Sequence, residues 1–459
     1  MAVRFVIIGA GPAGVQAATH AARLGAQVTV VERDVLGGAA NLWDCIPSKA
    51  MIATGAVLSM AGRAEGMGLV PMAAAPDLEA LRARIKFVSG HLERSITGLL
   101  ADQGVRVVRG SARLKGPHEV VAETAGGLEE LAADAVLVST GSRPRIPDWA
   151  EPDGVRLLTT RQAYPPPALP THVVVIGSGV TGVEFVHLFR SFGSRVSLVV
   201  SRQQVLPAKD VEVAAALEED FLASGVKLLK GARAVAVDYE GGGEADATDV
   251  VVRCDDGRVA RGSHALLAIG SLPNYEGLGL EAAGVEVGEG GYVPVNQHCQ
   301  SNVAHIYAAG DLSGKLPLAS VASMQGRKVA EHVMGLHTRQ HRHLDYEKAA
   351  SAIFTEPEIA DVGLAEAEAF AIGRKIRVTK VPFAANARAL IDGDPRGFVK
   401  IVSDPATGIV LGGSIVGRGA SELISVIALA VTAHLKVTDI VESLLVHPAL
   451  AEALADAAE

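Results

Sequence analysis

Residues 6–14 read VIIGAGPAG, and residues 174–182 read VVIGSGVTG. In each copy an apolar run leads into a G-x-G-x-x-G turn, and a stretch typical of an amphipathic helix follows. This order of strand, turn and helix predicts two βαβ dinucleotide-binding folds. The glycines are Gly9, Gly11 and Gly14 in the first copy and Gly177, Gly179 and Gly182 in the second.

The glycines of each turn have a chemical purpose. A pyrophosphate is stabilised at the N-terminus of a helix, where unpaired backbone N–H groups and the helix dipole face the anion. Side chains at these positions would hold the phosphates away from the backbone. A lone G-x-G-x-x-G is often only a tight turn, but here both copies lie between a predicted strand and a predicted helix. Each turn is therefore expected to bind one dinucleotide.

The two copies differ at the end of the next strand. Residues 28–31 lead to Glu32, whose carboxylate is placed to accept hydrogen bonds from a ribose diol. Residues 196–200 lead instead to Ser201 and Arg202, without an acid. A carboxylate would repel a 2′-phosphate, whereas Arg202 with Ser201 can bind one. The second site is expected to accept NADPH, and nothing in it rejects NADH.

Two dinucleotide sites in one chain imply a bound flavin and a diffusing nicotinamide, so FAD is the expected cofactor and NAD(P)H the expected co-substrate. A third segment supports FAD, because residues 304–308 predict a short strand that leads to Gly310 and Asp311. The Asp311 carboxylate can contact the polar middle of FAD. Two further strands end in small residues, at Thr140-Gly141 and at Gly270, which suits chain crossings between nucleotide domains.

Residues 37–49 read GGAANLWDCIPSK and look like a redox-disulfide motif with one sulfur missing. Cys45 is present, but Ala40 stands where a partner thiol would be needed. The other cysteines, Cys254 and Cys299, are far away in sequence, so a local disulfide is not expected. Electrons that pass this site are expected to use something other than a dithiol.

The composition is that of a multidomain globular protein. Of the 459 residues, 49% are hydrophobic and 20% are charged, and at roughly 150 residues per domain the chain accommodates about three domains. The net charge of −9 and the lack of a basic stripe argue against a nucleic-acid partner.

A targeting or membrane-spanning segment is not expected. The N-terminal apolar run is interrupted at Gly9, which predicts a strand and not a signal peptide. The longest apolar stretch elsewhere, residues 423–433, is shorter than the roughly 20 residues that a membrane helix needs. Three dispersed cysteines suit a reducing compartment, so a cytoplasmic location is expected.

The features follow one another in a specific order: the first turn, residues 37–49, the second turn with Glu184, Gly310-Asp311, FTEPEIA at 354–360, LGGSIVG at 411–417 and HPALAE at 447–452. This ordered set resembles the flavoprotein disulfide reductase family, the class of lipoamide dehydrogenase and glutathione reductase, over essentially the whole chain. The resemblance implies a glutathione reductase-like α/β fold with two Rossmann-like domains and a C-terminal α+β dimerisation domain.

The resemblance assigns roles where residues match. Lys49 and Glu184 correspond to the ion pair beside the flavin ring, where the cation favours the anionic reduced flavin and the carboxylate positions it. Cys45 corresponds to the flavin-side thiol, and Gly38 lies in the same FAD-contacting motif. Cys45 is interpreted either as a thiolate near the flavin or as a small buried residue kept for packing.

His447 and Glu452 match the active-site pair of the family. In that pair the carboxylate orients the imidazole, which belongs to the other subunit and shuttles protons to the substrate. A symmetric homodimer is therefore expected. Without an outer thiol, His447 is hypothesised to protonate a quinone oxygen, and the other interpretation is a residual pair that packs the dimer interface.

Ala40 departs from the family pattern and decides the predicted function. Disulfide substrates need the outer thiol, and Ala40 has no sulfur. The chain is interpreted as an FAD-dependent oxidoreductase that passes hydride from NAD(P)H through the flavin to a quinone-type acceptor. Within the family it is similar to an actinobacterial branch, the lipoamide dehydrogenase A-type NAD(P)H:quinone reductases, which shares the GGAA and DCxPSK patterns.

Three other functions stay open. A dihydrolipoyl dehydrogenase is favoured by His447 and Glu452 and opposed by Ala40. A pyridine nucleotide transhydrogenase would need only the flavin and two nicotinamides in turn. A non-catalytic NAD(P)H or redox sensor would bind flavin without turnover, which Lys49 and Glu184 disfavour because they serve the flavin's electronics.

Four segments are predicted along the chain: an FAD-binding domain over 1–147, an NAD(P)-binding domain over 148–271, a central FAD-contacting segment over 272–343 and an interface domain over 344–459. Within the first, residues 76–101 carry apolar residues at helical spacing. His337, His341 and His343 lie in a polar connector, but no cysteine accompanies them and a metal site is not expected.

Overall fold

A computed structural model describes residues 2–241, 249–336 and 344–459 of the chain. Proximity of Cα atoms divides the chain into two compact units. The first unit comprises residues 1–50, 79–145 and 271–346, and the second comprises residues 51–78, 146–270 and 347–459. The predicted boundaries at 147 and 271 remain predictions, and the boundary at 343, like the histidine-containing connector, lies outside the described residues.

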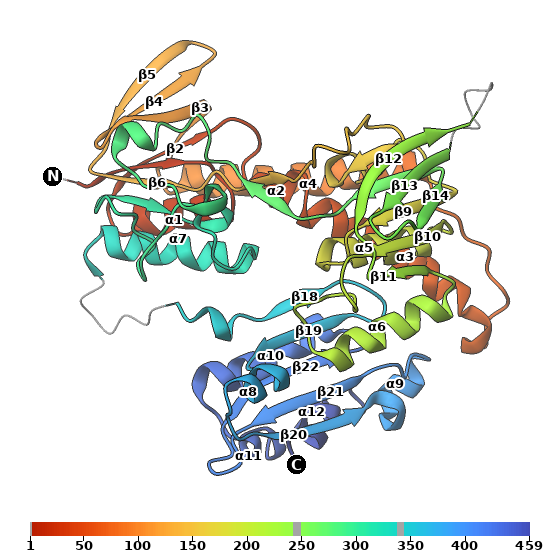
Figure 1. Cartoon of the computed structure of the whole chain (residues 1–459). Helices are drawn as coiled ribbons and strands as arrows, with labels where there is room; N and C mark the ends of the chain where they lie inside the picture. The colour runs from red at the N-terminus through yellow and green to blue at the C-terminus, as the bar shows by residue number, and fades with distance from the viewer. Residues whose placement is uncertain (1, 242–248, 337–343) are drawn as a thin grey trace. The chain divides into compact units, whose positions relative to one another are not determined.

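The first unit is built on a seven-stranded sheet with the order β17-β6-β1-β2-β3-β4-β5 (Figure 1). Its strands are β1 Arg4–Ile8, β2 Gln27–Glu32, β3 Arg106–Gly116, β4 Glu119–Thr124, β5 Gly127–Ala132, β6 Ala135–Val138 and β17 Ile306–Ala308. The five strands from β17 to β3 pair in parallel, whereas β4 and β5 extend the sheet by antiparallel pairing. The parallel part is the predicted Rossmann-like fold.

The apolar run at the start of the chain forms a strand that is buried on both faces. Phe5 and Ile7 belong to one hydrophobic cluster with α1 (Pro12–Arg23) and α7 (Ala319–Val333). Val6 and Ile8 belong to a second cluster on the opposite face. Side chains alternate along a strand, so a strand covered on both faces needs a continuous apolar run.

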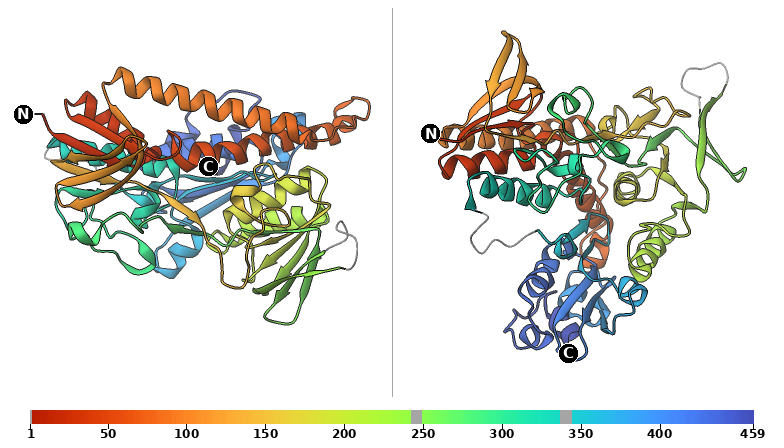
Figure 2. Two further views of the ribbon diagram at one scale, coloured as in Figure 1. Left: turned by 90° about the horizontal axis from the view of Figure 1, so that it is seen from above. Right: turned by 60° about the vertical axis from the view of Figure 1, so that its left-hand side comes forward.

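Helices α1 and α7 lie side by side (Figure 1). A Cβ atom at Gly326 of α7 would lie 2.1 Å from the carbonyl oxygen of Ala13 of α1, so only glycine permits this crossing. The long helix α4 (Leu78–Asp102) is uninterrupted in Figure 2 and confirms the helix predicted over 76–101. The strands β7 (Ser142–Pro144) and β16 (Ser271–Pro273) pair as an antiparallel two-stranded ribbon.

The second unit contains the second nucleotide fold. Its parallel sheet has the order β11-β10-β9-β15-β8, with β8 Leu157–Thr159, β9 His172–Ile176, β10 Arg195–Val200, β11 Lys227–Lys230 and β15 His264–Leu267. An antiparallel sheet adds β12 Ala234–Glu240, β13 Asp249–Cys254 and β14 Val259–Gly262. The helices are α5 Val180–Ser191, which follows the glycine-rich turn, and α6 Val211–Ala223.

The C-terminal part of the second unit is an antiparallel sheet with the order β18-β19-β22-β21-β20. The strands are β18 Ser351–Ile353, β19 Ile359–Gly363, β20 Arg377–Pro382, β21 Phe398–Ser403 and β22 Val410–Val416. The helices are α8 Glu366–Ala371, α9 Ala387–Ile391, α10 Ala420–Ala433, α11 Val437–Val441 and α12 Glu452–Ala458. Helices α10 and α12 share one hydrophobic cluster with the sheet. The predicted α/β fold with an α+β C-terminal domain is confirmed.

Residues 37–49 contain helix α2 (Gly38–Leu42) and the start of helix α3 (Cys45–Gly62). Among the described residues, the stretch Gly38–Gly62 is long and apolar enough to cross a membrane by length and composition. This stretch is longer than residues 423–433, the longest apolar stretch expected from the sequence, and it contains the charged residues Asp44 and Lys49. One such stretch is weak evidence, since a core helix passes the same test.

Candidate dinucleotide and redox site

The first glycine-rich turn has the geometry that a pyrophosphate needs. Gly9 has φ +97°, and a Cβ there would lie 2.5 Å from the Ser139 carbonyl oxygen. A Cβ at Gly14 would lie 2.0 Å from the Gly9 carbonyl oxygen, so α1 packs directly on the turn. At Gly11, by contrast, no described atom lies within 4 Å of the added Cβ. Two glycines therefore close the turn, and the third leaves open space at the helix end.

The N-terminus of α1 presents backbone donors to that open space. Gly11 is the N-cap residue, and a glycine has no side chain to accept the first N–H groups. Pro12 follows as the first helical residue. A phosphate is the type of group that such a helix end stabilises.

Glu32 ends β2 beside this turn and is 7% exposed. Its Oε2 accepts a hydrogen bond of 2.7 Å from the Ala10 backbone N–H, and its Oε1 accepts one of 2.8 Å from the Asp34 N–H. Glu32 therefore fixes the turn as well as facing it. Each carboxylate oxygen has a second lone pair, so the predicted contact with a ribose hydroxyl remains chemically available.

Gly37 and Gly38 bring the redox motif to the same turn. The Gly37 N–H donates to the Ala10 carbonyl oxygen at 2.8 Å. Gly38 has φ +62°, and a Cβ there would lie 2.8 Å from the Cα of Gly11. The start of α2 thus lies against the first nucleotide site, and only glycine allows this approach.

Cys45 begins α3, and its thiol is half-buried. In the first turn of α3, the Ser48 hydroxyl donates to the Cys45 carbonyl oxygen at 3.1 Å. All three cysteines lie in the described part of the chain, and each is a thiol there. Burial raises the pKa of Cys254, and it raises the pKa of Cys299 to about 11, so both are poor nucleophiles at neutral pH.

Thr140 and Gly141 lie between β6 and β7 and are hydrogen-bonded to Asn274, the residue after β16. The Thr140 hydroxyl donates to the Asn274 carbonyl oxygen at 2.7 Å, and the Asn274 N–H donates to the Gly141 carbonyl oxygen at 2.9 Å. Gly141 and Gly270 have φ of +68° and +95° and nothing within 4 Å of an added Cβ among the described atoms. At both glycines, the side of the backbone where a side chain would point is open.

Gly310 and Asp311 lie at the start of a short 3₁₀ helix after β17. The Gly310 N–H donates to Gln325 Oε1 at 2.7 Å, and the Ser142 hydroxyl donates to Asp311 Oδ2 at 2.5 Å. Sequence reasoning did not single out Gln325 or Ser142. Gln325 is a polar residue on α7 that is only 1% exposed, but its burial is visible only in three dimensions.

The second glycine-rich turn repeats the geometry of the first. Gly177 has φ +110°, and a Cβ there would lie 2.3 Å from the Ala268 carbonyl oxygen. A Cβ at Gly182 would lie 1.9 Å from the Gly177 carbonyl oxygen, whereas Gly179 has no described atom within 4 Å. Gly179 is also the N-cap of α5 and makes no side-chain capping bond. Both turns therefore fit a dinucleotide.

Ser201 and Arg202 are exposed at the end of β10. The Arg202 carbonyl oxygen accepts from the Gly231 N–H at 3.0 Å, which fixes its backbone. Within the described parts of the chain, the Arg202 guanidinium makes no ion pair. Arg202 thus combines a fixed backbone with a guanidinium that is available to bind a 2′-phosphate.

Glu184 lies on α5 and is 6% exposed. Its Oε1 accepts from the Phe354 backbone N–H at 3.0 Å. Lys49 belongs to the first unit and Glu184 to the second. Their predicted pairing therefore stays a prediction.

His447 and Glu452 form the predicted pair. His447 Nδ1 lies 2.8 Å from Glu452 Oε1, and the Ala449 N–H donates to Glu452 Oε2 at 2.8 Å. The Ala449 N–H and then His447 hold the pKa of Glu452 below its ordinary value, so the carboxylate is ionised and orients the imidazole. The His447 side chain is 74% exposed, with its ring available to another molecule.

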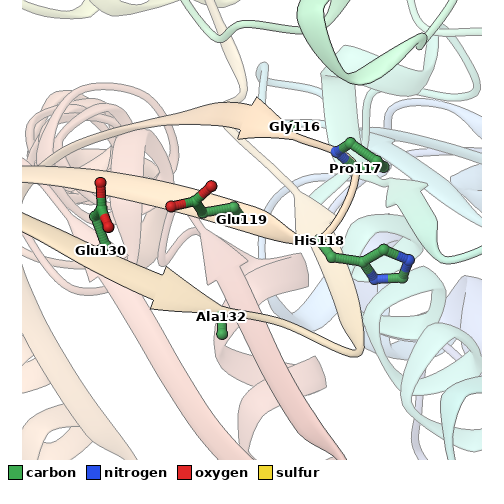
Figure 3. Close-up of a pocket in the computed structure, with 6 residues that line it drawn as sticks. All are labelled: Gly116, Pro117, His118, Glu119, Glu130 and Ala132. Atoms are coloured by element: carbon green, nitrogen blue, oxygen red, sulfur yellow. The ribbon is translucent and has the colours of Figure 1, made fainter.

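A separate pocket lies on the β3-β4-β5 sheet and is lined by Gly116, Pro117, His118, Glu119, Glu130 and Ala132 (Figure 3). Figure 3 shows Glu119 and Glu130 on neighbouring strands, with the His118 ring pointing away from them. Both carboxylates bind Lys115 Nζ, at 3.1 and 2.6 Å. The predicted site residues do not line this pocket.

Two dinucleotide turns, a redox-motif segment and a His–Glu pair define a class of nucleotide-dependent oxidoreductases. Consistent with this class, residues 3–326 match the family model described as pyridine nucleotide-disulphide oxidoreductase, and residues 349–458 match its dimerisation domain. The chain belongs to the pyridine nucleotide-disulphide oxidoreductase family, a family of flavoproteins, and the predicted resemblance is confirmed.

Individual relatives cover the whole chain. It is 42% identical to NAD(P)H dehydrogenase (quinone) of Mycobacterium tuberculosis over 100% of this chain and 94% of the relative. It is 34% identical to dihydrolipoyl dehydrogenase of Zymomonas mobilis over 98% of this chain and 96% of the relative. The crystal structure of LpdA from M. tuberculosis matches with a TM-score of 0.93 and 42% identity over 99% of both chains.

The glycine geometry predicts different outcomes for two neighbouring substitutions. Gly182→Ala places a Cβ on a backbone oxygen, so it should lower the melting temperature by the equivalent of roughly 1–3 kcal/mol. Gly179→Ala has space and a φ of −74°, so it should keep the melting temperature and weaken NADPH binding. Thermal unfolding and NADPH titration measure the two effects. Equal melting temperatures for both variants would contradict the close helix–turn contact assigned to Gly182.

Proposed function

We propose that this chain is an FAD-dependent NAD(P)H:quinone oxidoreductase that works without a redox disulfide. The observation that carries the proposal is Ala40 on α2, at the position that needs a second thiol, in a chain whose two nucleotide turns both have the geometry that a dinucleotide needs. A quinone takes up two electrons and two protons and needs no thiol in the enzyme. The M. tuberculosis relative named NAD(P)H dehydrogenase (quinone) supports the choice of acceptor.

The first site is proposed to hold FAD. The α1 N-terminus at Gly11 binds the pyrophosphate, Glu32 accepts from the ribose, and Gly38 allows α2 to lie against the cofactor. Thr140, Gly141, Gly310 and Asp311 contact its middle part. When bound, the flavin accepts a hydride from a nicotinamide and gives two electrons to an acceptor.

The second site is proposed to hold NAD(P)H. Gly177, Gly179 and Gly182 bind the pyrophosphate at the start of α5, and Gly270 borders the same site. Ser201 and Arg202 bind the 2′-phosphate.

Four further residues act next to the reacting groups in this proposal. Lys49 and Glu184 pair beside the flavin ring, where the ammonium stabilises negative charge and the carboxylate orients the ammonium. Cys45 lies on the same side and tunes the charge of the site. His447, oriented by Glu452, donates a proton to the quinone oxygen.

A homodimer in the cytoplasm is proposed as the working form. The dimerisation domain over residues 349–458 supports the homodimer, since His447 is exposed on it and would serve the partner's site. Three cysteines that are all thiols suit a reducing compartment.

A comparison of acceptors tests the proposed function. The purified protein should oxidise NADPH with a soluble quinone, and it should show negligible NAD⁺ reduction with dihydrolipoamide. The His447–Glu452 bond of 2.8 Å keeps dihydrolipoyl dehydrogenase as the second candidate. Strong dihydrolipoamide-dependent NAD⁺ reduction would favour that candidate and contradict the proposal.

Replacement of the imidazole separates the two half-reactions. His447→Ala should lower the rate of quinone reduction by roughly 100-fold, because general acid catalysis is lost, and leave the rate of flavin reduction by NADPH unchanged. Anaerobic stopped-flow absorbance measures both rates. His91→Ala, at an exposed histidine of α4, is the control. An unchanged quinone rate in His447→Ala would mean that the pair only packs the interface.

Replacement of Arg202 tests the preference for NADPH over NADH. Arg202→Ala should raise the KM for NADPH by roughly 10- to 100-fold, since a charge-assisted bond contributes about 1.5–3 kcal/mol, and leave the KM for NADH unchanged. Arg195→Ala, at the other end of β10, serves as the control. Equal changes in the KM for NADPH and for NADH would contradict the assignment of Arg202 to the 2′-phosphate.

A further inference from the structure

Helix α5 carries two titratable side chains on its buried part, one turn apart. Glu184 is 6% exposed and His187 is 7% exposed. Burial lowers the pKa of His187 to about 4, against the opposing influence of Glu356, so His187 is neutral. One group that orients the Glu184 carboxylate comes from the segment that follows β18.

That segment is residues 354–358, which connect β18 to β19. Its Phe354 N–H donates to Glu184 Oε1 at 3.0 Å. A backbone N–H has a fixed direction, and the carboxylate follows it. The orientation of Glu184 consequently depends on the position of this short connection.

Glu356 anchors the connection, two residues after Phe354. Its Oε1 accepts hydrogen bonds from three donors: Ser59 Oγ at 2.9 Å, Arg63 Nη1 at 2.6 Å and Arg396 Nη2 at 3.0 Å. Ser59 lies on α3, Arg63 directly follows that helix, and Arg396 precedes β21. One oxygen atom thus ties the connection to two other elements of the same unit.

The two arginines are themselves fixed. Arg396 binds Asp394 at 2.6 Å and Asp220 of α6 at 2.6 Å, and Arg63 binds Asp394 at 3.3 Å. Asp394 is buried, so the network is protected from water. A partly buried, multiply bonded carboxylate of this type holds a backbone more firmly than an exposed ion pair does.

We propose that Glu356 is a positioning residue for the flavin site: through the backbone of Phe354 it fixes the carboxylate of Glu184. The inference rests on the proposed function, in which Glu184 orients the ammonium beside the flavin. Glu356 itself touches neither cofactor nor substrate in this account. A small displacement of a preorganised charge is enough to change the rate of the reaction that it serves.

The test uses the holoenzyme and the reductive half-reaction alone, so that it does not depend on the acceptor. Glu356→Ala should lower the rate of flavin reduction by NADPH by roughly 10-fold or more and shift the flavin midpoint potential in the same direction as Glu184→Gln. The double variant should be no slower than Glu184→Gln. Glu356→Gln keeps an oxygen at the Oε1 position and should restore most of the rate.

A matched control separates positioning from stability. Glu366→Gln weakens the ion pair with buried Lys400 in the same unit and lies outside the Glu356 network, so it should lower the melting temperature without changing the flavin potential. If Glu356→Ala does not fold, Ser59→Ala removes one of the three donors and should change rate and potential in the same direction by a smaller factor.

The outcomes are distinguishable. An unchanged rate and potential in Glu356→Ala, alongside a slow Glu184→Gln, would overturn the inference and leave the proposed function intact. A Glu356→Gln variant as slow as Glu356→Ala would also overturn it, because charge and not position would then be responsible. An unchanged Glu184→Gln would overturn both the inference and the role proposed for Glu184.

Discussion

The contact between a glycine and a turn carbonyl is the constraint on which the structure depends. It occurs once at Gly14 over the Gly9 oxygen and again at Gly182 over the Gly177 oxygen, with added Cβ distances of 2.0 and 1.9 Å. This contact sets how closely a helix follows a strand. It leaves the N-termini of α1 and α5 open at Gly11 and Gly179, where anionic groups are stabilised.

The redox motif is built on the same constraint. Gly38 approaches Gly11 because neither residue has a side chain, so the start of α2 lies at the first nucleotide site. The missing sulfur at residue 40 is therefore placed next to the proposed flavin site and not at a remote surface. In the proposed function, the electron path is shortened to nicotinamide, flavin and acceptor, and Cys45 is left to influence the charge beside the flavin.

Much of this arrangement could be predicted from local sequence, because its causes are local. The turns at 9–14 and 177–182 need glycine for steric reasons, and the apolar runs before them indicate strands buried on both faces. The His447–Glu452 pair is likewise only five residues apart, and one backbone N–H fixes its carboxylate.

Other features depend on contacts between distant residues and left no local signal. Gln325 is hydrogen-bonded to Gly310, and Ser142 is hydrogen-bonded to Asp311. Glu356 accepts hydrogen bonds from residues 59, 63 and 396. Glu32 shows the same limit, since its position at a strand end was predictable but its two bonds to the backbone of Ala10 and Asp34 were not.

Anaerobic titration of the purified holoenzyme with NADPH, followed by visible absorbance, tests the central claim most directly. An electron path without a dithiol predicts full reduction of the flavin by one equivalent of NADPH. A requirement for two equivalents, with a long-wavelength band from a thiolate beside the oxidised flavin, would contradict the account and would mean that Cys45 has a redox partner.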